Sequence, residues 1–304
     1  MKKKILIVVG LALIACSGIW KFTVAPKLTQ RLPRGWSWKS RSIASMILPD
    51  PVTGKLGGGE TIATPYVLEG WVIDESERPA AIVVKDRYTA YDAATDTVVW
   101  EYLQSGKVDP QTGRHLDPKF RSDYFVFPRN VEKKAYSIRY SFLKGLPLQF
   151  QKEETIQGLQ AYVFGYKGSI EYTDTYAGTP DYPGVKFEPG QEVRCADDGF
   201  VFKTWVEPLS GEFIKLESSC YSGDYVFETA TGKRLSPLQI WGGVTAGDEV
   251  TARVQALMKE RRRLLAISLY IPGLLLLAGL VLAGPPSIST FSTRRKDAKT
   301  RHIA

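Results

Sequence analysis

The chain has few of the residues on which most catalytic and metal sites depend. Its 304 residues include two histidines and three cysteines, and no two cysteines form a CxxC pair. His115 follows a turn-forming stretch and His302 lies in a basic tail, so neither is placed as a catalytic base or metal ligand. Carboxylates are plentiful, but their spacing singles out no acid pair. We therefore expect no enzyme, no metal and no cofactor.

A basic surplus is also missing from most of the chain. The formal net charge is +8. Residues 1–21 carry four lysines and no acid, while residues 294–301 carry five Lys/Arg against one Asp, so each end contributes +4. The rest is neutral overall and offers no excess of cations for a phosphate backbone. Nucleic acid is not an expected partner.

Two long apolar runs without charge occupy residues 5–20 and 264–283. At 1.5 Å per residue the second run would be about 30 Å long, which matches the hydrocarbon core of a bilayer. Pro272 would at most kink such a helix, and a membrane span tolerates a kink. We expect residues 264–283 to cross a membrane.

The first run allows two interpretations. An MKKK start followed by an apolar segment is typical of an uncleaved membrane anchor, and the chain stays apolar up to Pro26. The same start with LIAC at residues 13–16 also fits a lipoprotein signal that is cleaved and then acylated on Cys16. Either interpretation holds the region between the two runs to a membrane at both ends.

The region between the runs has the texture of antiparallel β structure. Segments such as DYFVFP and GFVFKTWVEP combine β-branched and aromatic residues and are bounded by Gly, Pro and Asp. We expect a mainly β fold, with an antiparallel barrel-like or sandwich domain between two transmembrane helices. The expected organisation is an N-terminal anchor or signal at 1–25, a connector at 26–49, the β-rich domain at 50–245, a basic amphipathic helix at 246–263, a span at 264–283 and a basic tail at 284–304.

The side on which the β domain lies follows from weaker signals. The basic residues that flank the domain would place it in the cytoplasm if they were simply counted. Three features favour the opposite: MKKK is an export-type start, long domains translocate largely regardless of charge, and two cysteines lie close together in the domain. We expect a cell-membrane protein with an extracytoplasmic domain and both termini in the cytoplasm.

A short pattern recurs in five places, which start at residues 50, 92, 109, 207 and 228. Each copy has an acidic residue followed within a few positions by Thr or Ser, and in four of the five copies a Gly comes next. The intervals are too irregular for a propeller or solenoid. No copy has the spacing of a phosphate-binding or calcium-binding loop. The acid can accept backbone N–H bonds and the Gly supplies a positive φ, so the pattern predicts tight turns.

Cys195 and Cys220 flank the hairpin whose tip is EPLSGE. Paired strands would bring their outer ends near each other, so a Cys195–Cys220 disulfide is a reasonable expectation, although the two residues are slightly out of register about the turn. Two reduced, buried thiols are the alternative.

The basic helix before the second span has an apolar face that includes Val254, Leu257 and Met258. This face would pack on the domain or dip into the membrane interface, while Arg261, Arg262 and Arg263 could hold anionic lipid headgroups or simply set the depth of the span. In the connector, Trp36 and Trp38 are expected either at the membrane interface or buried against the domain.

Several phrases resemble the PorA-type family of bacterial two-span membrane proteins, described as porins. They are APKLTQRLP after the first run, DRYTAYDAATDTVVW, FPRNVEKKAYSIRY, EETIQGLQAYVFGY and TWVEPLSGEF. The resemblance implies two spans around a β-rich external domain and a channel role, although nothing in the sequence reads as a transmembrane barrel. The arrangement also resembles that of class B scavenger receptors, whose external domain holds a lipid tunnel.

We therefore expect an anchored β domain that binds or transfers membrane lipid or another apolar ligand. A pore subunit and a non-catalytic structural or interaction protein of the envelope are the alternatives. An apolar cavity would favour the first function and a packed core the last.

Overall fold

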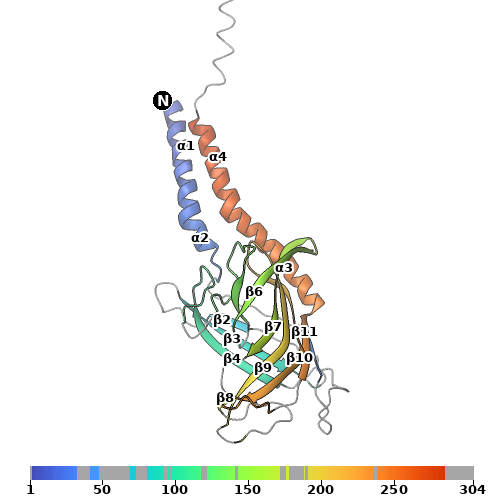
Figure 1. Cartoon of the computed structure of the whole chain (residues 1–304). Coiled ribbons are helices and arrows are strands. Elements are labelled where there is room, and N and C mark those ends of the chain that lie inside the picture. The colour runs from blue at the N-terminus through green and yellow to red at the C-terminus, as the bar shows by residue number, and fades with distance from the viewer. Residues whose placement is uncertain are drawn as a thin grey trace, which may run out of the picture. The chain divides into compact units, whose positions relative to one another are not determined.

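The structure is a computed structural model in which the chain forms two compact units (Figure 1). One unit comprises residues 1–29 and 262–304, and the other comprises residues 30–261. The structure describes residues 2–32, 42–47, 69–72, 81–91, 95, 98–117, 122–140, 143–171, 176–177, 188, 191–235 and 239–284.

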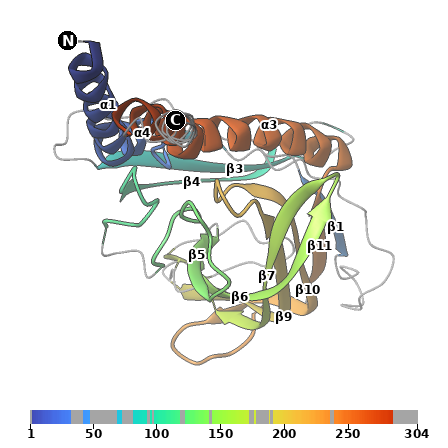
Figure 2. The same ribbon diagram turned by 90° about the horizontal axis from the view of Figure 1, so that it is seen from above.

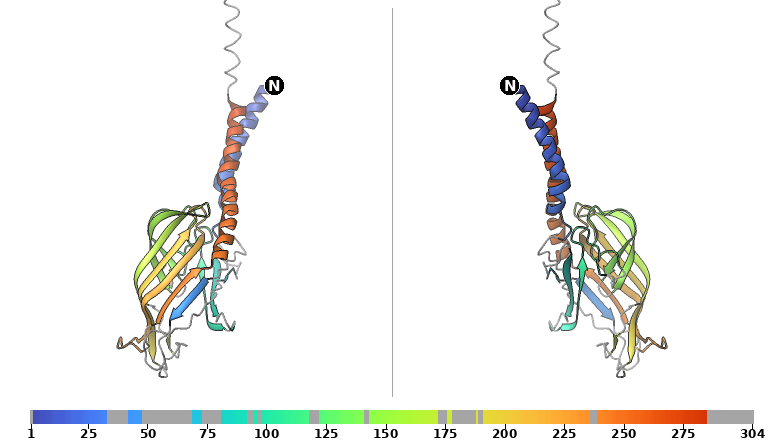
Figure 3. Two further views of the ribbon diagram at one scale, coloured as in Figure 1. Left: turned by 90° about the vertical axis from the view of Figure 1, so that its right-hand side faces the viewer. Right: turned by 90° about the vertical axis from the view of Figure 1, so that its left-hand side faces the viewer.

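The first unit is a pair of apolar helices that lie side by side (Figure 3). One helix consists of α1 (Lys2–Ile19), a π-helical turn η1 (Trp20–Val24) and α2 (Ala25–Leu28). The other begins as α3 (Gly247–Leu265), most of which belongs to the second unit, and continues through a π-helical turn η2 (Ala266–Tyr270) into α4 (Ile271–Ala283). Both are long and apolar enough to cross a membrane, in agreement with the two runs in the sequence.

Glycine allows the two helices to approach each other closely. A Cβ atom added at Gly10 would lie 2.6 Å from the backbone nitrogen of Ala283 and 2.7 Å from the carbonyl oxygen of Gly279. Further along, the Ser17 hydroxyl donates to the Pro272 carbonyl at 2.8 Å. Contacts therefore run backward along the second helix as they advance along the first, so the pair is antiparallel. Small residues that bring backbones together are typical of helix pairs in membranes.

A tryptophan compensates for a proline at the wide turn η2. The Ile271 amide donates to the Ala266 carbonyl, five residues back, so the next donor in this register would be residue 272. Pro272 has no N–H, which leaves the Ile267 carbonyl without that donor. The indole Nε1–H of Trp20 donates to this carbonyl at 2.9 Å. Because an unsatisfied carbonyl is costly in a bilayer, this bond favours the paired state of the helices.

The close approach at Gly10 gives a prediction with an internal control. A Gly10→Ala change should weaken the pair by about 1–3 kcal/mol, because its Cβ meets backbone atoms that cannot rotate away. Gly18→Ala should be nearly neutral, since a Cβ there has nothing within 4 Å. The measurement is energy transfer between dyes at Lys4→Cys and Gly284→Cys, in a background without other cysteines, during titration with a denaturing detergent. Equal midpoints for the two alanine variants would contradict the packing.

The main element of the second unit is a large antiparallel sheet. Its strand order is β1-β11-β10-β9-β7-β6-β5, and the short β8 pairs with β9. Figure 2 shows β6, β7, β9, β10 and β11 side by side in a curved array. The strands are β1 (Ser42–Ile47), β5 (Tyr136–Tyr140), β6 (Leu143–Ile156), β7 (Leu159–Glu171), β8 (Tyr176–Ala177), β9 (Glu192–Val206), β10 (Phe213–Glu228) and β11 (Gln239–Thr245).

The amphipathic helix α3 covers one face of this sheet. Alternation along β7 turns Leu159, Ala161 and Val163 to this face, where they pack with Trp205 and Ile214 of the neighbouring strands. The helix contributes Val250, Val254 and Leu257 to the same cluster, with Met258 at its edge. Burial of each large apolar side chain stabilises the unit by about 1.5–3 kcal/mol. The apolar face predicted for the basic helix therefore packs against the sheet of the domain.

The opposite face holds an aromatic core. Phe164 of β7 and Phe200 and Phe202 of β9 pack there with Phe127 and Tyr136 from outside the central strands. Phe127 lies 4.9 Å from Phe164 and 5.2 Å from Tyr136 between ring centroids, within the range of favourable aromatic pairs. Both faces of the central strands are thus covered by the chain itself.

A second, smaller sheet has the order β2-β3-β4, with β2 (Glu69–Val72), β3 (Ile82–Tyr91) and β4 (Val98–Val108). Ile82, Val84 and Val108 pack there with Leu32 and Phe125. Among the described strands β1 and β5 are the two ends of the large sheet and do not pair, so the sheet is open. The antiparallel prediction is confirmed, but the barrel-like alternative is wrong, and long helices make the chain less purely β than expected.

Candidate functional site

Three of the five acid-led phrases lie in described residues, and all three are tight turns. In the first, the Gly113 amide donates to the Asp109 carbonyl at 2.8 Å. The same bond joins Gly211 to Glu207 and Gly232 to Glu228. The three glycines have φ values of +75°, +75° and +68°, a region that glycine enters without strain. The turn prediction is confirmed for these copies; the copies at 50 and 92 lie largely outside the described residues.

One of the three turns differs from the others because its acid is buried. Glu207 has no exposed surface. Its carboxylate accepts the backbone N–H of Ser210 at 2.6 Å and that of Leu209 at 3.2 Å. The guanidinium of Arg261, on α3, donates to the same carboxylate at 3.0 Å. A buried carboxylate is tolerated only when it is bonded and neutralised in this way.

The same turn binds an arginine from the start of the unit. Arg31 is only 1% exposed, and its Nε donates to the Phe127 carbonyl at 2.6 Å. Its two terminal nitrogens donate to the Glu212 carboxylate at 2.5 Å and to the Gly211 carbonyl at 3.0 Å. A planar guanidinium suits such a fork of acceptors better than a lysine ammonium would.

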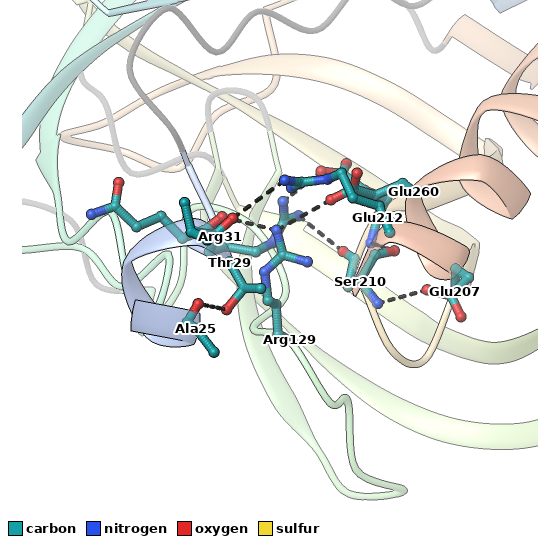
Figure 4. Close-up of polar contacts among 12 residues, drawn as sticks. Ala25, Thr29, Arg31, Arg129, Glu207, Ser210, Glu212 and Glu260 are labelled. Carbon is teal, nitrogen blue, oxygen red and sulfur yellow. Dashed lines mark hydrogen bonds and ion pairs between the residues drawn. The ribbon is translucent and has the colours of Figure 1, made fainter. Parts of the chain in front are cut away.

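A third arginine completes the arrangement. Arg129 donates to the Gln30 carbonyl at 2.8 Å and forms an ion pair with Glu260 of α3 at 3.6 Å. We call the group the clasp; its members are Arg31, Arg129, Glu207, Glu212, Glu260 and Arg261. Figure 4 shows Arg31, Arg129, Glu207, Glu212 and Glu260 converging with Ser210. The three arginines and three glutamates balance in charge.

The clasp joins segments that are distant in the sequence. Residues 30–31 are the first of the second unit and residues 260–261 are the last. The turn at 207–212 and the neighbouring residues 127–131 bind both of them, and the Asn130 and Val131 amides donate to the turn carbonyls of Leu209 and Pro208. Both chain ends of the β domain are therefore fixed on one hairpin turn.

Gly211 offers a direct test of this close approach. A Cβ at Gly211 would lie 2.2 Å from the Pro128 carbonyl oxygen, whereas a Cβ at Gly232 has nothing within 4 Å. Gly211→Ala and Gly232→Ala should share the cost of a left-handed alanine, about 1 kcal/mol. Gly211→Ala should cost about 2 kcal/mol more, because the clasp must open. Thermal unfolding of the purified protein measures both, and equal losses would show that the turn is not closely packed.

A model of the porin family described as "Porin PorA" matches residues 86–284. The chain belongs to the PorA family. The match begins at the DRYTAYDAATDTVVW phrase and includes the turn at 207–212 and the second apolar helix, so the resemblance seen in the sequence is confirmed. No curated protein matches the chain.

The predicted Cys195–Cys220 disulfide is wrong for this PorA-family chain. Cys195 lies opposite Val226 and Cys220 lies opposite Phe200 in the β9–β10 register. The two cysteines are thus about five residues apart along the pair, roughly 16 Å at strand spacing. A disulfide needs Cα atoms within about 7 Å. No cysteine forms a disulfide in the structure.

The other predicted site residues are placed as follows. Arg262 and Arg263 are exposed, whereas Arg261 belongs to the clasp. Cys16 is an exposed residue within α1. Trp36 and Trp38 lie outside the described residues. Among the described part of the chain, no group of three or more His, Cys, Asp or Glu could hold a metal ion.

His115, which the sequence did not place as a base or ligand, is a half-buried titratable group. Its ring meets Phe125 edge-on at 5.8 Å between centroids, and Arg139 lies over the same Phe125 ring. Burial, followed by the nearby positive charge of Arg139, lowers the pKa of His115 from 6.5 to about 4, although Asp117 acts in the opposite direction. The imidazole is therefore neutral at physiological pH.

The lowered pKa of His115 predicts a pH-dependent stability. Between about pH 6.5 and pH 4 the unfolded chain takes up a proton at this residue and the folded chain does not, so the free energy of unfolding should fall as pH falls through this window. His115→Gln should remove that component. Histidine NMR on a His302→Gln background should give His115 a midpoint below about 5, and a midpoint near 6.5 would contradict the burial.

Proposed function

We propose that this PorA-family chain is a non-catalytic, membrane-anchored protein of the cell envelope, whose extracytoplasmic β domain is a rigid module that works at the lipid surface. The observation that carries the proposal is the clasp. It fixes the first and last residues of the domain on one turn, and those residues connect to the two apolar helices. An antiparallel pair of spans needs its two connections to leave from one place, and the clasp supplies that place.

The proposed ligand of the module is membrane lipid, and the packing favours contact at the headgroups over an enclosed chamber. The apolar face of α3 lies on the sheet, and the opposite face of the sheet is filled by aromatic side chains. Lipid or another apolar ligand would have to displace these contacts to enter the described core. A surface role requires no such displacement.

The porin description of the family favours one alternative, a pore. The exposed side chains in the middle of the spans do not favour it, because Leu11, Leu274 and Leu277 are all apolar. Water-filled pores are lined with polar groups, and a purely hydrophobic constriction tends to dry. The large sheet is open among the described strands, so it does not close a channel either.

The topology can be tested with reporters inserted at Gly232, in an exposed turn, and fused to the C-terminus. We expect the Gly232 reporter on the extracytoplasmic side and the C-terminal reporter in the cytoplasm, since two antiparallel spans place both termini together. A cytoplasmic signal from Gly232 would overturn the proposal. Steady single-channel conductance of the purified protein in planar bilayers would favour the pore instead.

A further inference from the structure

The parts of the two apolar helices that belong to the first unit carry charge of one sign only. Residues 2–29 and 262–284 contain no Asp or Glu. Their basic residues form two groups, one at residues 2–4 and a second that consists of Lys21, Lys27, Arg262 and Arg263. We call the second group the basic band. All four of its residues are exposed.

Contacts within the helix pair place the basic band at one end of the pair. Trp20 donates to the Ile267 carbonyl, and Arg263 donates to the Leu28 carbonyl at 3.3 Å. Lys27 on one helix thus lies at the height of Arg262 and Arg263 on the other, and Lys21 lies six residues, about 9 Å, nearer the middle of the pair. The Arg263 bond also satisfies a carbonyl at the end of α2, which otherwise lacks a helical donor.

The spacing of the two basic groups matches the thickness of a bilayer. Lys4 and Lys21 are 17 residues apart, which is about 26 Å along a helix. A hydrocarbon core is about 30 Å thick. When residues 2–4 lie in one headgroup layer, the basic band lies in the other.

We propose that the basic band binds the phosphate groups of anionic phospholipids in the leaflet nearer the β domain. Residues 2–29 and 262–284 bring together cations and no carboxylate, a charge distribution that favours an anionic ligand at the band. Phe22, next to Lys21 in the chain, is 78% exposed, and the Lys21 ammonium lies 5.8 Å from its ring centroid. A large apolar side chain beside cations fits a lipid, which has acyl chains below its headgroup, better than a soluble anion.

The structure also says which arginines take part. Arg261 donates to the buried carboxylate of Glu207 and is committed to the clasp. Arg262 and Arg263 are the members of the Arg261–Arg263 cluster that belong to the helix pair. The lysines of the first helix, which the basic cluster in the sequence does not include, supply the other half of the band.

The inference rests on the proposed membrane anchoring and is tested on the full-length protein. The probe is a mixed micelle of phosphatidylglycerol and phosphatidylcholine, and native mass spectrometry counts the lipids of each kind that stay bound. A Lys21→Gln, Lys27→Gln, Arg262→Gln variant leaves Arg263 in place to hold the two helices. A juxtamembrane cation contributes roughly a fivefold preference, so this variant should lose at least tenfold in phosphatidylglycerol binding with little change in phosphatidylcholine.

A matched control separates site binding from net charge. Lys167, Lys203 and Lys233 are exposed on the β domain, and their triple change to Gln removes the same charge. This control should retain the preference of the natural chain. Equal losses in both variants, no loss in either, or displacement of the lipid by millimolar inorganic phosphate would overturn the inference. Resistance of the band variant to alkaline extraction from membranes shows that the variant is still anchored. Failure of the membrane-anchoring proposal can therefore be told apart from failure of the lipid-binding inference.

Discussion

The buried carboxylate of Glu207 is the constraint on which the β domain depends. A charge with no exposed surface must be compensated locally, and the turn that contains Glu207 supplies only two N–H donors. The remaining donor comes from Arg261, so the carboxylate determines where α3 lies. Once α3 is held there, Val254 and Leu257 cover the sheet. The clasp and the apolar packing therefore support each other, and neither would be well defined alone.

The local parts of this arrangement could be predicted from the sequence. A turn at 207–212 depends on an acid, a Gly and the residues between them, all within six positions, and the three described copies behave alike. The two long apolar helices were equally predictable, because length and lack of charge suffice to identify them. The amphipathic pattern of α3 also showed which of its residues are apolar, although it left open whether they would meet the domain or the membrane.

The site itself could not be predicted, because its bonds join distant residues. Arg31 and Glu212 are 181 positions apart, and nothing in the phrase TQRLPRG marks Arg31 as a buried cation. The cysteines failed for a different reason. Counted from the Val206–Phe213 pair that closes the turn, Cys195 already lies opposite residue 224, four residues beyond Cys220, and the register shifts near Phe213 and Cys220 increase the offset.

The few polar groups of the helix pair form hydrogen bonds within the pair, and this limits what a PorA-family chain can do with these two helices. Ser17 and Trp20 both donate to carbonyls of the partner helix. Their bonds leave Leu274, Leu277 and similar side chains to face outward. Such a surface suits lipid and gives water or ions nothing to bind. The charged groups lie above and below this apolar zone, so recognition by this chain is expected at the headgroups and on the β domain, where the clasp holds both connections in place.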